Sequence, residues 1–190
     1  ATIISPDKVT QLESLVINLT DPTLSAQVNA STGHINLQGQ NNLAIDSISV
    51  TGEAESNQLE AMVKKLGLEL PVALPASISF ETAAAGNLDK LGIDSLEIVI
   101  KDEGVDATLS ATAENVLDQS GIIATLTTNV ASTANLSKFA GMEIPDLGSV
   151  VVKSRVSSAG QTFKLDTLDF QLEGEDLQAT LNGTIQDLLV

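Results

Sequence analysis

Three stretches of the chain share one pattern, and this repeated pattern most constrains the fold. They are LVINLTDPTLSAQV from Leu15, LEIVIKDEGVDATL from Leu96 and LDFQLEGEDLQATL from Leu168. In each, apolar residues occupy alternate positions, a short turn-forming segment follows, and the alternation resumes around an alanine. Because side chains of a strand point alternately to its two faces, each stretch predicts a β-hairpin with one apolar face.

Each hairpin is expected to turn through four residues, a common loop length. The turns are then TDPT (20–23), KDEG (101–104) and EGED (173–176). This pairing sets Phe170 opposite Ala179 and Leu172 opposite Leu177, and directly opposed residues share a face. The residues expected to share the apolar face are Leu15, Ile17, Leu19, Leu24, Ala26, Val28, Leu96, Ile98, Ile100, Val105, Ala107, Leu109, Leu168, Phe170, Leu172, Leu177, Ala179 and Leu181.

The hairpins recur along the chain as structural repeats. From Leu15 to Leu96 is 81 residues, and from Leu96 to Leu168 is 72. Periods this long predict stacked supersecondary units. We expect a single β-repeat domain over 1–190, with units at approximately 9–86, 87–158 and an incomplete 159–190.

Two short helices are expected between the hairpins. NQLEAMVKKL has Asn57 as a predicted N-cap and Gly67 at its end, and TANLSKFA has Thr133 as a predicted N-cap and Gly141 at its end. The segments GLELP and GMEIP follow these patterns, and their prolines prevent the helices from continuing.

Further alternating segments supply the other strands of the sheet. They include Ile35 with Leu37, Ile48 with Val50, Ile78 with Phe80, Ala124 with Leu126, Val150 with Val152, and Phe163 with Leu165. The chain is therefore predicted to be mainly β. The expected fold is a repetitive antiparallel sheet of about ten strands, curled into a groove or open half-barrel, with two short helices between repeats.

Two helices, each only about 15 Å long, are too small to cover the apolar face of such a sheet. An uncovered face of this size exceeds what soluble monomers normally expose. The sheet can roll into a sandwich or barrel, it can oligomerise, or it can form an open groove whose aliphatic wall holds acyl chains. Alternating aliphatic residues are also the ordinary pattern of a sandwich core.

Composition excludes several function classes. The net charge of −16 and the 2% aromatic content argue against nucleic-acid binding, which needs basic grooves and stacking platforms. The absence of cysteine removes disulfides and thiolate catalysis. We expect no cofactor.

The sequence signals for a catalytic or metal-binding site are weak. His34 is the only histidine and has no obvious catalytic or metal-binding partner. The acidic loops lack the spacing of an EF-hand and are interpreted as solvated turns. Their carboxylates are Asp102, Glu103, Asp106, Glu173, Glu175 and Asp176. We therefore expect neither a metal site nor an enzyme.

The chain resembles the AsmA-like proteins of Gram-negative envelopes. The resemblance rests on LDTLDFQLEGEDLQATLNGTIQDLL, on its weaker copy IDSLEIVIKDEGVDATLSATAENVL, and on GLELP and GMEIP after the helical patterns. It covers most of the chain from about Leu15 to Val190. It implies a β-groove that binds phospholipid acyl chains, in a periplasmic protein anchored in the inner membrane.

The implied role is phospholipid transport between membranes or outer-membrane homeostasis. The anchor and the chorein-like N-terminal region of that family are not in this sequence, so we expect an internal or C-terminal segment. A severed repeat array also has exposed edges, which predicts possible edge-strand self-association.

Two other functions stay open at this point. One is a structural or adhesive β-repeat module with a closed, packed core. The other is a soluble β-sandwich with a protein-binding surface, which the repeat period disfavours.

Overall fold

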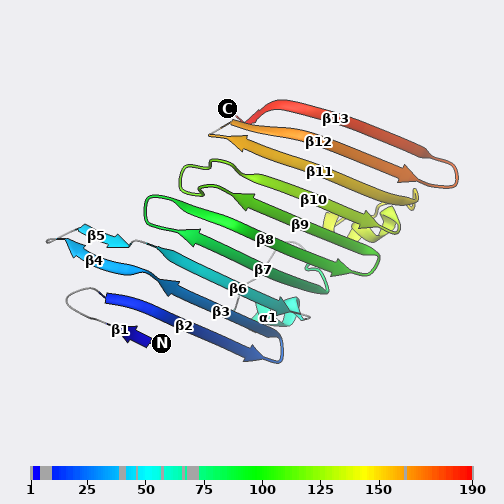
Figure 1. The fold of residues 1–190 in the computed structure, drawn as a ribbon. Helices are drawn as coiled ribbons and strands as arrows, with labels where there is room; N and C mark the ends of the chain where they lie inside the picture. Colours follow the sequence, from blue (N-terminus) through cyan, green and yellow to red (C-terminus); the bar gives the residue numbers. More distant parts are fainter. Residues whose placement is uncertain are drawn as a thin grey trace.

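The computed structural model describes residues 2–4, 10–38, 42–45, 47–56, 58–65, 67, 73–160 and 162–189. Ten long antiparallel strands form one sheet that is not closed into a barrel (Figure 1). They are β2 (Thr10–Asp21), β3 (Leu24–Thr32), β6 (Ile48–Ser56), β7 (Ser77–Gly86), β8 (Leu91–Asp102), β9 (Val105–Ala113), β10 (Ile123–Val130), β11 (Ser149–Ala159), β12 (Thr162–Glu173) and β13 (Gln178–Leu189). The predicted fold class is confirmed.

The strands follow one another in space almost in chain order, from β2 at one side to β13 at the other. The exception is a hairpin of β4 (His34–Gln38) and β5 (Asn42–Ile45), which lies between β3 and β6 in the sequence, whereas in the sheet β3 pairs directly with β6. β4 and the short β1 (Thr2–Ile4) pair with the start of β2. Neighbours in sequence therefore pair in space, which is the arrangement expected of a β-meander.

Two helical segments interrupt the meander. The helix α1 (Leu59–Lys65) follows β6, and the 3₁₀ turn η1 (Thr133–Leu136) runs directly into α2 (Ser137–Ala140) after β10. Both lie behind the sheet in Figure 1, near the strand ends that carry the hairpin turns of β2–β3, β8–β9 and β12–β13. The element order strand, helical segment, strand thus occurs twice. The proposed unit boundaries stay a prediction.

The helix boundaries differ in part from those expected. Ser132, not Thr133, caps η1, because its hydroxyl accepts a hydrogen bond from the Ala134 N–H at 3.1 Å. The Thr133 hydroxyl instead donates to the Pro145 carbonyl at 2.6 Å and fixes the chain that returns to β11. Gly141 ends α2 in the left-handed conformation, as predicted. Asn57 lies outside the described residues.

The predicted hairpin registers are wrong by two residues. Phe170 faces Leu181 rather than Ala179, Ile100 faces Ala107 rather than Val105, and Ile17 faces Val28 rather than Ala26. An even shift keeps every side chain on its original face, because the period of a strand is two. The prediction of a shared apolar face therefore does not depend on this error.

Local turn chemistry explains the shift. The first two hairpins turn through two residues, Pro22–Thr23 and Glu103–Gly104, rather than four. Gly104 has a φ of 66°, which glycine adopts without strain, and the Asp21 carboxylate accepts a hydrogen bond from the Thr23 N–H at 2.9 Å. The last hairpin keeps a four-residue turn that starts one residue later than expected, at Gly174.

A β-bulge recurs at the same place in the three strands that open the hairpins. The segments Leu12–Leu15, Ile93–Leu96 and Leu165–Leu168 all read apolar, acidic, hydroxyl, leucine. The register shifts at each of them, on the β1 side of β2 and on both sides of β8 and β12. Bulges bend a strand and increase its twist, so the sequence repeat carries its own local bend.

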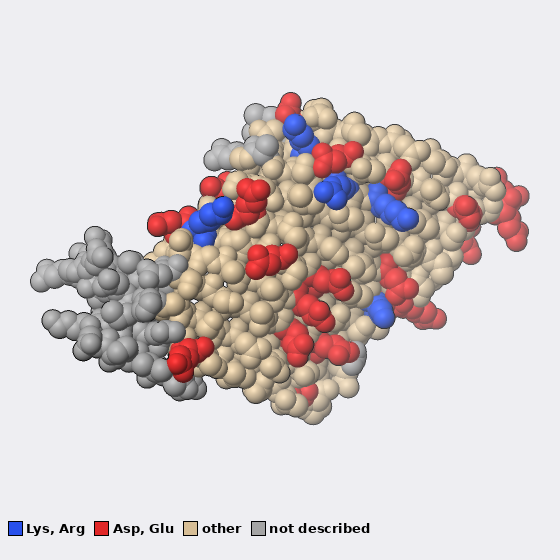
Figure 2. Space-filling model, viewed as in Figure 1, with Lys and Arg blue, Asp and Glu red and all other residues tan. Residues whose placement is uncertain are grey.

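The sheet has one apolar and one polar face. Figure 2 shows the polar face, on which many acidic and several basic side chains lie. Hydroxyl and amide residues occupy other positions of this face. Ladder pairing sets Glu53 opposite Glu81 and Glu81 opposite Glu97, so three carboxylates form a row across β6, β7 and β8. Like charges directly opposed across a ladder are destabilising.

We expect Glu81→Gln to stabilise the protein, because it removes the middle charge of this row. The gain in free energy of unfolding should be about 0.2–1 kcal/mol at low salt, and added salt should reduce it. Urea unfolding at two salt concentrations measures the effect. Glu143→Gln, in an exposed loop, is the control. An equal gain in both variants would contradict a specific role for the row.

Candidate functional site

The apolar face consists of rows of side chains that cross all ten strands. One row, traced through the ladder pairs, is Leu19, Ala26, Ala54, Phe80, Ile98, Leu109, Leu126, Ser154, Leu168 and Gly183. The next is Ile17, Val28, Gly52, Thr82, Leu96, Ala111, Ala124, Val156, Leu165 and Ile185. At about 4.8 Å per strand, each row is about 43 Å long.

The structure brings together nearly all the residues that the sequence assigned to this face. The exception is Leu177, which lies in the last hairpin turn and is exposed. The carbonyl of Leu177 accepts a hydrogen bond from the Gly174 N–H at 2.9 Å. Leu177 was therefore wrongly placed on the wall, because the turn lies one residue later than expected.

Four strands between the hairpins complete the apolar face. They contribute residues such as Val50, Phe80, Leu126 and Val152. The sequence showed the alternation of apolar and polar residues in these strands. It did not show whether their apolar side chains lie on the same face of the sheet as those of the hairpins. The ladder pairs supply that information.

The second helical segment covers only the hairpin end of the apolar face. Leu136 and Phe139 pack on a cluster of Val105, Val130, Val150 and Leu172. In the part of the chain that the structure describes, the other buried apolar residues are Leu59 of α1 and Ala113. The helical segments therefore cover the strand ends at the hairpin turns, while Ala113 is buried at the opposite end of β9.

Away from the helices the apolar face is open to solvent. Ile17 is 51% exposed, Leu126 is 37% exposed and Leu181 is 57% exposed. The total accessible surface is 12329 Å² for a chain of 19.7 kDa. A compact monomer of this mass exposes about 8,600 Å². An excess of exposed surface is expected of a sheet whose apolar face has no second layer.

An ion pair attaches each helical segment to the strand that opens the preceding hairpin. Lys65 of α1 pairs with Asp21 at the end of β2, at 2.8 Å. Lys138 of α2 pairs with Asp102 at the end of β8. Both carboxylates lie on the apolar face, since Asp21 is opposite Leu24 and Asp102 is opposite Val105. The two contacts are equivalent in the repeats.

The two aspartate side chains differ in how deeply they are buried. The Asp102 side chain is 5% exposed, and burial raises the pKa of its carboxyl. Hydrogen bonds from Lys138 and the Glu103 N–H outweigh that effect and hold the pKa below its ordinary value. At the more exposed Asp21, hydrogen bonds from Lys65 and Thr23 lower the pKa well below its usual range.

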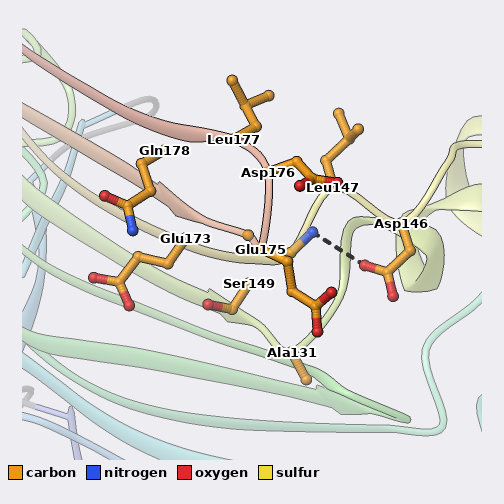
Figure 3. A pocket seen from close by; sticks show the side chains of 11 residues that line it. Ala131, Asp146, Leu147, Ser149, Glu173, Glu175, Asp176, Leu177 and Gln178 are labelled. Carbon is orange, nitrogen blue, oxygen red and sulfur yellow. Dashed lines mark hydrogen bonds between the residues drawn. The ribbon is translucent and has the colours of Figure 1, made fainter.

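The acidic candidates that the structure describes lie in the hairpin turns and beside an open cavity. An open cavity of about 850 Å³ lies beside the last hairpin turn, with Asp146, Glu173, Glu175 and Asp176 at its wall (Figure 3). Asp146 already accepts a hydrogen bond from the Gly148 N–H at 3.1 Å. Among the described residues no group of three or more His, Cys, Asp or Glu is placed to hold a metal ion. The side chain of His34 lies outside the described part.

Comparisons with known proteins leave the family open. No family model matches the chain, and no curated protein or solved structure matches it. None of the described helices is long and apolar enough to cross a membrane. The resemblance to AsmA-like proteins therefore stays a prediction.

Removing the Lys138 ammonium should destabilise the protein, because it leaves the Asp102 carboxylate buried without its partner. We expect Lys138→Met to lower the free energy of unfolding by about 1–3 kcal/mol at neutral pH. This is less than a fully buried pair would lose, because Lys138 is half-exposed. Chemical denaturation measures the loss.

The stabilisation should also depend on pH. Asp102 has a lowered pKa in the folded protein, so the pair stabilises above the unfolded value of about 3.9 and is lost as pH falls through the folded value. The wild type and Lys138→Met should therefore converge in acid. Lys90→Met, in an exposed loop, should match the wild type throughout. Equal losses at Lys90 and Lys138, or parallel pH curves for Lys138→Met and the wild type, would contradict this account.

Proposed function

We propose that this chain is a lipid-binding segment of a periplasmic, inner-membrane-anchored protein of the AsmA-like type. Its apolar face carries phospholipid acyl chains during transport between membranes or in outer-membrane homeostasis. The observation that carries the proposal is one continuous, open apolar face across ten antiparallel strands.

The dimensions and chemistry of the face suit hydrocarbon chains. Most strands present about four apolar positions on this face, at alternate residues, so the apolar band is about 20 Å wide along the strands. Its side chains are mainly Leu, Ile, Val and Ala, and the aromatic residues among them include Phe80 and Phe170. An acyl chain gains about 0.8 kcal/mol for each methylene group that it buries.

The polar face supports the same proposal from the other side. A sheet with apolar side chains on both faces would need a covering layer on each face. Here the hydroxyl, amide and charged residues of the polar face keep one side hydrated while the other holds lipid. The periplasmic location and the membrane anchor rest only on the family resemblance.

A structural or adhesive β-repeat module is the alternative function. Such a module holds its shape through a closed, packed core. The described residues bury few large side chains, and none is fully buried. That observation favours the lipid-binding proposal.

A charge on the open part of the face should prevent lipid binding without unfolding the sheet. We expect Leu126→Asp to lose at least tenfold in uptake of fluorescent phosphatidylethanolamine from vesicles, because an ionised carboxylate is costly to place against hydrocarbon. Leu126 is partly exposed, so the folded state should tolerate the change. Fluorescence after separation from the vesicles measures uptake.

Thr127→Asp is the matched control, because Thr127 follows Leu126 in β10 and points to the polar face. It should take up lipid as the wild type does. Circular dichroism verifies that both variants fold. A wild type that takes up no phospholipid, or equal uptake by the two variants, would refute the proposal.

A further inference from the structure

The two long borders of the apolar face differ. Both helical segments lie along the border at the hairpin turns, where Leu136 and Phe139 pack on buried side chains (Figure 1). The opposite border, which we call the loop border, carries the β7–β8, β9–β10 and β11–β12 connections, and none of the described helical segments lies there. Along β10 the exposed fraction rises from 3% at Val130, in the covered cluster, to 37% at Leu126. The helices therefore close the hairpin border and not the loop border.

The width of the apolar band fits one acyl chain laid along the strands. The band is about 20 Å wide in that direction. One leaflet contributes about 15 Å to the hydrocarbon core of a bilayer, which is the depth that one acyl chain spans. In this direction the ester and the phosphate reach a border of the face and stay hydrated. A chain laid across the strands would set its ester group against apolar side chains in the middle of the face, which is unfavourable.

The hairpin border is a poor place for a phosphate group. The end of β12 and the turn that follows it carry Glu173, Glu175 and Asp176. Lys65 and Lys138 of the helical segments already pair with aspartates. A lipid phosphate at this border would therefore meet like charges, which repel it.

The loop border carries fewer carboxylates. The β11–β12 turn has no charged residue, and the β7–β8 turn has one acid and one base, Asp89 and Lys90. The β9–β10 connection has two carboxylates, Glu114 and Asp118. A phosphate is therefore repelled less at this border than beside the acidic turn of β12–β13.

We propose that phospholipids bind with their acyl chains parallel to the strands, their terminal methyl groups toward the helical segments and their headgroups at the loop border. The covered cluster, which includes Val130 and Leu172, then limits how far each chain extends. Several lipids lie side by side along the rows of about 43 Å, all in the same direction. This orientation rests on the proposed function, because it specifies how the same face holds lipid.

Two lysines on one strand test the orientation in the intact chain. Ala107 and Ala111 both lie on the apolar face of β9, about 13 Å apart, with Ala107 nearer the helices. Ala107→Lys sets an ammonium among the chain ends, where a charge is costly. Ala111→Lys can extend its ammonium toward the phosphates at the loop border. We expect uptake of fluorescent phosphatidylethanolamine from vesicles to be at least tenfold lower for Ala107→Lys than for Ala111→Lys.

Thr108→Lys is the control for the added charge, because Thr108 lies on the polar face of the same strand. It should take up lipid as the wild type does. Circular dichroism verifies that all three variants fold. Equal uptake by the two alanine variants, or lower uptake by Ala111→Lys, would overturn the orientation.

Nitroxide-labelled lipids test the orientation in the unsubstituted protein, so this test stands even if a lysine variant does not fold. Ile93 and Ile100 lie on the apolar face of β8, Ile93 toward the loop border and Ile100 toward the hairpin border. A nitroxide on the headgroup of phosphatidylethanolamine should broaden the methyl signal of Ile93 more than that of Ile100. A nitroxide near the end of an acyl chain should broaden that of Ile100 more.

The outcomes separate this orientation from the proposed function. Lipid uptake with the same broadening ratio for both labels, or with the two ratios exchanged, would refute the orientation and leave the proposed function standing. A wild type that takes up neither labelled lipid would refute the proposed function, and the orientation with it.

Discussion

The rest of the molecule depends on one constraint: cross-strand pairing keeps apolar side chains on one face of the sheet and polar side chains on the other. Because strand side chains alternate, a slip of one residue anywhere would move apolar side chains into the polar face. The ladders hold this alternation through ten strands and through the bulges at Asp94 and Asp166. Rows such as the one through Ile98, Leu109 and Leu126 therefore stay continuous.

This continuity creates an apolar area that the chain covers only in part. The two helical segments are short, and ion pairs attach them beside the hairpin turns. They close the hairpin end of the face and leave the remainder free. Stability then comes from ladder hydrogen bonds and neighbouring side chains within one layer. The exposed aliphatic rows have no second layer from this chain. Acyl chains bound to the face would supply one.

The sequence predicted which face each strand residue takes, because that depends only on a local period of two. It did not predict the register, which two-residue turns at Pro22 and Gly104 decide. It also placed Leu177 on the wall, since an apolar turn residue looks like a strand residue. Whether the sheet closes could not be read from the sequence, because a sandwich core shows the same alternation. The described residues of β13 and β2 do not pair, which excludes a closed barrel, and the exposure of Leu126 and Leu181 shows that this face is not a sandwich core.

Methyl NMR with a nitroxide-labelled phospholipid tests most directly whether the apolar face is open to lipid. The account predicts that the label broadens the methyl signals of Leu109, Leu126 and Ile98. The signals of Val99 and Val151, which lie on the polar face of β8 and β11 and so farther from the label, should broaden much less. Equal broadening on both faces, or no broadening of the Leu126 signals, would contradict the account.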